Sequence, residues 1–382
     1  FYYVVILNSG YVSKVGFAMI AITTIFGTFY IEKIAKNKLF YIWGLYFIIL
    51  YLNYLGGDQY FDLIKFLSEA IQFLLLIIIL IVYVDKSGDQ IYIQKLAMFA
   101  LITTSFICLL TIPNLISNPG LYREKELFSE ELSIGGSYKW LASYSMIHGV
   151  IVLFPIIVFI IKSKKISTLT RASFAGLGLI LFLTVFLSNA TTPLFLALFT
   201  ILISIFLRPS KEYKSSYMFV RFFFLPLIGI IFIEFYMTHF LLFIQDFYSS
   251  GSSNYKKIDN IVNDGFGYSP RQYYYMISVK GFESSPIFGT NNILGIGRHS
   301  FFLDRLSSLG LVGFSILSVL IVSIFKYIYK RLIFTRIYFL IGFLSTLILW
   351  LFKNVINFEM LFYPIIILPG LCIFAENKLK KM

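Results

Sequence analysis

Cationic side chains and a histidine gather in one polar stretch, 243–305, late in this 382-residue chain. At its centre Arg298 and His299 follow Gly295 and Gly297, and glycines there let a ligand approach the backbone closely. The planar guanidinium of arginine donates paired hydrogen bonds to phosphate. A histidine is the usual base for a hydroxyl, because its pKa lies near neutrality. The stretch could therefore bind a phosphate group and accept a proton, with further cations at Arg271, Lys280 and Arg305.

An apolar frame must position these residues. Hydrophobic residues make up 58% of the chain and charged residues 13%, against about 25% charged residues in a soluble domain. A soluble enzyme, a disordered chain and a disulfide scaffold are thereby excluded, and an all-α polytopic membrane protein is expected. A spanning helix needs about 20 mostly apolar residues. Eleven candidates satisfy this: 15–31, 39–55, 66–84, 96–112, 146–161, 172–188, 192–207, 222–242, 306–325, 337–352 and 359–375, and residues 1–7 could end a twelfth.

Basic residues mark one side of these spans. Twenty of the 32 Lys and Arg, but five of the 19 acids, lie in the loops 32–38, 85–95, 162–171, 208–221, 326–336 and the tail from 376. These segments carry a net charge of +15 and the rest of the chain −2, so the formal +13 is mainly a topology signal. The positive-inside rule places them in the cytoplasm. We therefore expect one transmembrane domain, 1–382, with two large outer loops at 113–145 and 243–305.

A helix over 270–282 is expected within the second outer loop. Pro270 falls in its first turn, where proline is tolerated. Apolar residues at 275, 276, 279 and 282 then recur at helical spacing. We expect this helix to be amphipathic and to lie on the outer surface of the membrane.

Residues 271–314 resemble the O-antigen polymerase and ligase superfamily of bacterial envelope glycan enzymes. The motif pieces, in chain order, are Arg271, Tyr275 one turn later, Pro286-Ile-Phe-Gly289, His299-Ser-Phe-Phe-Leu303 and Gly310-Leu-Val-Gly313. A long outer loop late in the chain, with few spans after it, is also similar to the family. Three positions depart from the pattern: Ser300 replaces a usual Asn, Ser308 a frequent acid, and Asn189 an Arg in a short outer turn.

The resemblance implies a repeat-unit polymerase for O-antigen or capsule in the bacterial cytoplasmic (inner) membrane. The enzyme would transfer a glycan from undecaprenyl pyrophosphate to a sugar hydroxyl of a lipid-linked acceptor, at the extracytoplasmic face. Its pyrophosphate would be held by Arg271, Arg298, Arg305 and, more weakly, Lys280, because fixed cations stabilise the charge that develops on the leaving group. His299 would orient or deprotonate the acceptor hydroxyl, with Arg271 as its catalytic partner. Membrane lipids, a chain-length regulator and other assembly proteins are the expected partners.

Other residues are weaker candidates. Asp58 and Asp62, four apart in the first outer loop, could ligate Mg²⁺ or Mn²⁺, although two acids in a wet turn are more commonly just solubilising. Arg123 in the first large loop and Tyr275 could contact the substrate. The proposed mechanism is metal-independent and needs no cofactor, since no His/Cys cluster suggests zinc and no Gly-rich loop suggests ATP. Nucleic acid is not an expected partner.

Three alternatives to a polymerase stay open. A ligase of the same superfamily would move finished glycan onto lipid A core or a protein, and we favour the polymerase because Asn189 and Ser300 replace ligase-like residues. A flippase for lipid-linked glycans would more often show Gly- or Pro-broken helices in two matched halves. A scaffold without chemistry would leave the pattern of Arg271 and His299 unexplained, although an outer-loop arginine can simply be solvated or paired with lipid headgroups.

Overall fold

The computed structural model describes ten parts of the chain, and all of their regular elements are helical. The described residues are 31–55, 63–84, 90–117, 142, 144–188, 190–207, 259, 270–290, 300–352 and 358–380. The all-α prediction is confirmed for this part of the chain.

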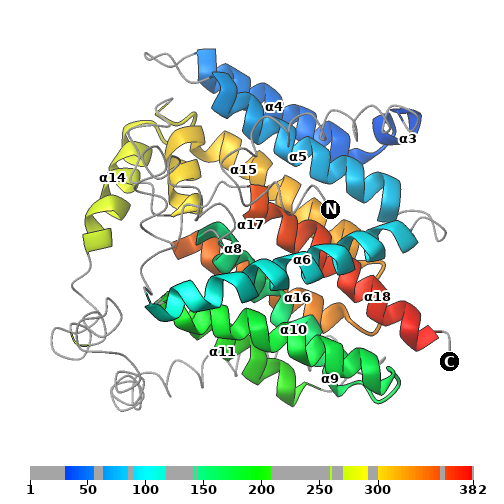
Figure 1. Cartoon of the computed structure of the whole chain (residues 1–382). Coiled ribbons are helices and arrows are strands. Elements are labelled where there is room, and N and C mark those ends of the chain that lie inside the picture. Colours follow the sequence, from blue (N-terminus) through cyan, green and yellow to red (C-terminus); the bar gives the residue numbers. More distant parts are fainter. Residues whose placement is uncertain are drawn as a thin grey trace.

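The helices follow one another in this order: α3 (Ile31–Ala35), α4 (Lys38–Leu55), α5 (Leu63–Val84), α6 (Gln90–Ser117), α8 (Tyr144–Gly149), the 3₁₀ helix η2 (Val150–Leu153), α9 (Phe154–Lys162), α10 (Thr168–Leu187), α11 (Thr191–Phe206), α14 (Pro270–Ser284), α15 (Phe301–Tyr329), α16 (Arg336–Phe352), α17 (Phe358–Phe362), the π-helix η3 (Tyr363–Ile367) and α18 (Leu368–Lys380). Most run along a common direction, and α14 lies across one end of the bundle (Figure 1).

Within the described residues, five helices are long and apolar enough to cross a membrane: α6, α10, α15, and the continuous stretches Ser145–Lys162 and Met360–Lys380. Shorter apolar helices occupy Lys38–Asn53, Ala70–Val82, Thr192–Phe206 and Arg336–Phe352. These helices coincide with predicted spans. The predicted spans 222–242 and, except for its last residue, 15–31 lie outside the described residues. The described part is thus built as a membrane protein is, and the total of eleven spans stays a prediction.

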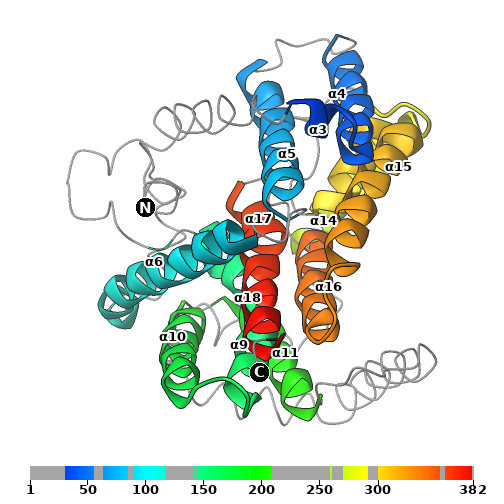
Figure 2. The same cartoon turned by 90° about the vertical axis from the view of Figure 1, so that its right-hand side faces the viewer.

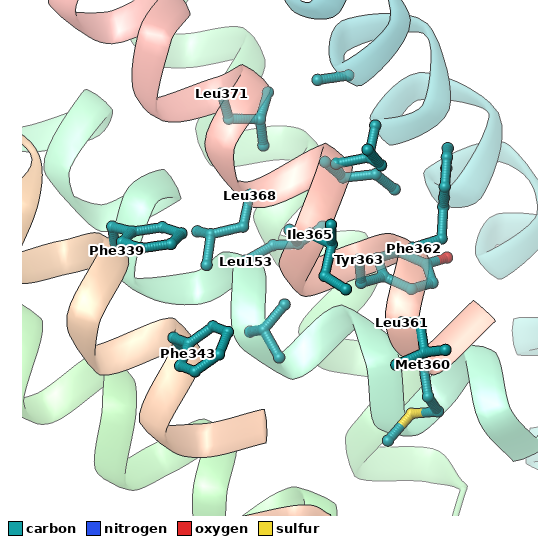
Figure 3. Packing of buried hydrophobic residues seen from close by; sticks show 14 of the residues in the cluster. Leu153, Phe339, Phe343, Met360, Leu361, Phe362, Tyr363, Ile365, Leu368 and Leu371 are labelled. Carbon is teal, nitrogen blue, oxygen red and sulfur yellow. The ribbon is translucent and has the colours of Figure 1, made fainter. Parts of the chain in front are cut away.

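The stretch Met360–Lys380 lies at the centre of the bundle, with α6 and α10 on one side, α16 on the other and α5 beyond its start (Figure 2). Phe339 of α16 points toward Leu368 in this central stretch (Figure 3). Tyr363 lies so close to Gly149 that a Cβ on the glycine would come within 2.4 Å of the ring. The Tyr363 hydroxyl is 3.0 Å from the Thr104 hydroxyl of α6. Small residues and one polar pair therefore let the surrounding helices approach the central stretch closely.

Some helices extend beyond the spans that the sequence predicts. The first large outer loop was expected to begin at 113, but α6 continues through Pro113 to Ser117. The proline lies in the last turns, where one intrahelical hydrogen bond is lost and little helix remains to be disturbed. The predicted span 306–325 is in fact the 29-residue helix α15, which begins at Phe301 and ends at Tyr329.

Basic side chains at the end of the bundle opposite α14 cap the carboxyl ends of helices. The Lys162 ammonium donates to the carbonyls of Ser204 (3.2 Å) and Leu207 (2.8 Å), where α11 ends. Arg171 Nε donates to the carbonyl of Ile161, 2.7 Å away, at the end of α9. The last carbonyls of a helix have no intrahelical partner and carry partial negative charge, so cations are favourable there. Basic residues that are predicted to mark the cytoplasmic side thus also donate hydrogen bonds to the last carbonyls of the helices.

Glu376 is an acidic residue that binds backbone amides at the amino end of helix α16. The sequence places it in the tail after the last span, but it lies buried within α18. Its Oε1 accepts hydrogen bonds from the backbone amides of Ile333 (2.7 Å), Phe334 (2.6 Å) and Thr335 (2.9 Å), and from the Thr335 hydroxyl (3.0 Å). These amides precede α16, so one carboxylate completes the turn between α15 and α16.

We predict that replacing Glu376 with Ala destabilises the folded protein by several kcal/mol. The change leaves buried amides without their shared acceptor, and each unpaired group costs about 1–3 kcal/mol. Thermal unfolding of the purified protein in detergent measures the loss. Glu376→Gln keeps an acceptor oxygen and should lose less, and Lys380→Ala, an exposed neighbour on the same helix, should lose nothing measurable. An Ala variant as stable as the parent would contradict the capping role.

Candidate functional site

Helix α14 packs against the first turns of α15 through small side chains. Ser278 is buried there, and a Cβ built on Gly281 would lie 2.2 Å from Ser307 Oγ. Met276, one of the apolar residues that predicted an amphipathic helix, is 53% exposed, and the placement of this helix on the membrane surface stays a prediction. A close approach of two helices requires small residues at the contact. Ser278 and Gly281 provide it, and the larger side chains point elsewhere.

A break in α15 lies directly beneath this contact. Gly310 has φ of +62° and ψ of −171°, so two helical segments meet there without a continuous hydrogen-bond ladder. The amides after the break are satisfied from the turn that follows α14: Leu311 N donates to the Pro286 carbonyl (2.9 Å) and Val312 N to the Ile287 carbonyl (3.2 Å). The Ser307 carbonyl accepts from Thr290 N (3.0 Å) in return. We call the turn 285–290 and its bonds to α15 the backbone clamp.

The clamp requires glycine at two positions. Gly289 has φ of +83°, and a Cβ on it would lie 2.1 Å from the Ser308 carbonyl oxygen. A Cβ on Gly310 would lie 2.3 Å from the Ile287 carbonyl oxygen. Both a positive φ and the backbone contact exclude any larger residue. The Pro-x-x-Gly and Gly-x-x-Gly pieces of the sequence pattern thus pair with each other and form one structural unit.

Two charged residues of α15 lie buried before the break at Gly310. Asp304 is 5% exposed and Arg305 is 2% exposed, both in the first turns of α15. The Ser278 hydroxyl donates a 2.6 Å hydrogen bond to Asp304 Oδ1, and the Arg305 guanidinium lies 5.7 Å from the ring centre of Phe301. Burial of a charge is unfavourable unless the charge is paired or hydrogen-bonded. A buried acid and a buried base next to a spanning helix make Asp304 and Arg305 candidates for a functional site.

Ser300 begins α15 as its capping residue. Its hydroxyl accepts a hydrogen bond from Leu303 N at 3.3 Å, and the residue is fully buried. Serine and asparagine cap helix starts about equally well. Ser300 can therefore play the structural role of the Asn expected at this position. Its presence no longer favours a polymerase over a ligase.

The structure describes part of the predicted set. Arg305 is buried in α15, next in the chain to Asp304, which contacts α14, and its guanidinium lies over the Phe301 ring. Tyr275 is half-buried one turn before Ser278, and the helical register puts position 271 one turn earlier on the same face of α14. Lys280 is exposed, and two residues after Ser278 it falls on another face of the helix than the contact with α15. Its predicted role with the other cations stays a prediction.

Several predicted residues lie outside what the structure describes: His299, Arg298, Asp58, Asp62, Arg123 and Asn189. Among the described residues, no three His, Cys, Asp or Glu side chains lie close enough together to hold a metal ion. Sequence reasoning missed Asp304 and Ser278. An Asp-Arg pair just before a long apolar run was the available signal for Asp304, because such charges at a span boundary need partners.

We predict that Gly310→Ala lowers stability by more than about 2 kcal/mol, through the unfavourable φ and the collision with the Ile287 carbonyl. Gly44→Ala is the matched control, because Gly44 lies in α4 with nothing within 4 Å of an added Cβ. Thermal unfolding in detergent should separate the two variants by several degrees. Equal transition temperatures would show that the clamp can relax at no cost.

We also predict a coupling free energy of about 1.5–3 kcal/mol between Ser278 and Asp304, the range for a hydrogen bond to a charged group. A double-mutant cycle with Ser278→Ala and Asp304→Asn, read by denaturant unfolding, measures it. Additive losses in the double variant would argue against the bond.

No protein-family model matches the chain, and no curated protein matches it in sequence. The candidate site consists of a buried acid and a buried base, next to a backbone clamp at one end of an apolar helical bundle.

Proposed function

We propose that the protein is a polysaccharide repeat-unit polymerase, a glycosyltransferase that joins lipid-linked oligosaccharides at the extracytoplasmic face of the bacterial cytoplasmic membrane. The donor is a glycan on undecaprenyl pyrophosphate, and the acceptor is a sugar hydroxyl of a second lipid-linked glycan. The observation that carries the proposal is the buried Arg305 beside the motif-bearing helix α14, at the end of the bundle away from the basic loops.

The charge distribution supports this sidedness. The capping cations Lys162 and Arg171, the α15–α16 turn and the carboxyl end of α18 belong to segments that the positive-inside rule assigns to the cytoplasm. They lie at one end of the bundle, and α14 lies at the other (Figure 1). A substrate site on α14 and α15 would then face outward, where lipid-linked glycans are polymerised.

The proposed reaction needs a fixed positive charge and a base. The acceptor hydroxyl oxygen attacks the anomeric carbon of the donor, the bond from that carbon to the pyrophosphate oxygen breaks, and the electron pair leaves on the pyrophosphate. Arg271 and Arg305 would stabilise the leaving charge, and a preorganised cation in a water-poor site can contribute several kcal/mol. His299, next to the cap of α15, would take the hydroxyl proton, a role worth roughly 10²–10⁴ in rate.

Ser278 and Asp304 would hold this arrangement in place. Their hydrogen bond ties α14 to α15, so position 271 and Arg305 keep a fixed separation during the reaction. Fixed geometry of this kind reduces the reorganisation that the transition state requires.

A ligase of the same superfamily is the second candidate, and one observation favours it. Ser300 caps α15 as an Asn would, which removes one of the two sequence arguments against a ligase. The two activities differ in the acceptor, which is a growing lipid-linked chain for a polymerase and a core lipid or a protein for a ligase. A flippase for lipid-linked glycans is the candidate from another class.

We predict that His299→Ala and Arg271→Ala each abolish long-chain glycan in the native host, because each removes a group needed only as charge moves in the transition state. Lys164→Ala, an exposed cation at the opposite end, is the control and should leave chain length and amount unchanged. Gel analysis of the surface polysaccharide reads the outcome, with protein abundance measured in parallel. Normal glycan in both site variants would refute the assignment.

Purified protein and a synthetic lipid-linked repeat unit separate the alternatives. A polymerase lengthens the repeat, a ligase does so only with its acceptor present, and a flippase moves it across a bilayer without a new glycosidic bond. Growth that persists in EDTA supports a metal-independent mechanism, whereas growth lost on chelation would favour Asp58 and Asp62 as metal ligands.

A further inference from the structure

An exposed apolar strip lies at the tip of the backbone clamp. It consists of Ile287, Phe288, Leu311 and Val312. Phe288 is 68% exposed, Ile287 55% and Leu311 50%. The two halves of the strip, 24 residues apart in the chain, lie side by side because Val312 N donates to the Ile287 carbonyl and Leu311 N to the Pro286 carbonyl.

The strip continues into the sides of the spanning helices. Beyond it on α15, Val319 and Val322 are exposed on the same face as Leu311, eight and eleven residues later. Helix α4 packs alongside, since a Cβ on Gly313 would lie 2.9 Å from Ile49 Cγ2, and its last turns expose Leu52 and Leu55. In a helix that crosses a bilayer, such faces contact lipid. The clamp tip is therefore the edge of a lipid-facing surface at the α14 end of the bundle.

The neighbouring helix α14 also exposes charged side chains. Lys280 and Glu283 are exposed on the face that carries Tyr273 and Met276, and charged groups belong in water or among headgroups. A phenylalanine left in water instead of hydrocarbon forgoes about 1.5–3 kcal/mol of transfer free energy. Apolar residues at the tip and charges along the neighbouring helix match the division between acyl chains and headgroups.

We propose that the Ile287–Phe288 turn inserts into the lipid leaflet at the α14 end of the bundle, with the Phe288 ring among the acyl chains just below the headgroups. The occupant of the strip is bilayer lipid. Insertion fixes the depth of the clamp, and through it the depth of α14. If the protein acts on a lipid-linked phosphate as proposed above, this places Arg305 near the height at which that phosphate lies; the insertion itself does not depend on the proposed reaction.

Spin labels on the full-length protein in phospholipid nanodiscs test the insertion. Both buried cysteines, Cys108 and Cys372, are first replaced by Ala. A nitroxide is then attached to a single cysteine at position 288, with position 319 as the lipid-facing reference and position 283 as the water-facing control. Power saturation compares collisions with oxygen, which concentrates in hydrocarbon, and with a water-soluble nickel chelate. All three sites are exposed, so labelled protein should stay folded, as size-exclusion chromatography verifies.

We expect the label at 288 to behave like that at 319, with oxygen collisions several-fold more frequent than nickel collisions, and unlike that at 283. Nickel collisions at 288 as frequent as at 283 would place the turn in water and overturn the proposal. A label at 288 shielded from both reagents would place it against protein, a second copy of the chain or a partner, and would also overturn it. Neither result bears on glycan transfer, so failure here is distinct from failure of the proposed function.

Discussion

A backbone amide or carbonyl without a hydrogen-bond partner is costly wherever water is scarce, and much of the architecture at the α14 end follows from this constraint. The break at Gly310 frees amides at the start of the spanning part of α15. The turn 285–290 supplies carbonyls to them, which fixes that turn and the end of α14 above it. The helix that carries Arg271 and Tyr275 is thus held by main-chain bonds, independent of which side chains the neighbouring loops present.

Elsewhere in the molecule, charged side chains supply hydrogen-bond partners to backbone groups at helix ends. Lys162 and Arg171 cap helix carboxyl ends, and Glu376 completes an amino end. Asp304 and Arg305 are buried in the first turns of α15. Asp304 lies in the first turn, where an acid interacts favourably with the helix dipole, and for Arg305 we propose the binding of an anionic substrate.

Much of the frame could be predicted from the sequence, because apolar runs of about 20 residues separated by basic loops have few other solutions. The helix at 270–284 was also within reach, since Pro270 and the spacing of its apolar residues mark it. Its packing face was not, because Ser278 and Gly281 contact α15 for their small size, a property that hydrophobic periodicity ignores. The backbone clamp could not be predicted either. The sequence shows Gly289 and Gly310, but only the structure shows that the two backbone segments lie in contact, so that both positions require glycine. Asp304 was missed since a single acid at a span boundary resembles any solvated charge.

The contact of Glu376 with residues 333–335 has a consequence for biosynthesis. Its carboxylate belongs to the last turns of the chain, while the amides that it satisfies precede the penultimate long helix. When α16 first leaves the ribosome, its amino end has no acceptor and must be hydrated, so the turn before it stays at a membrane surface. Only the emergence of α18 supplies the carboxylate that allows that turn to be buried. The order of translation thereby places the burial of this turn after the synthesis of α18.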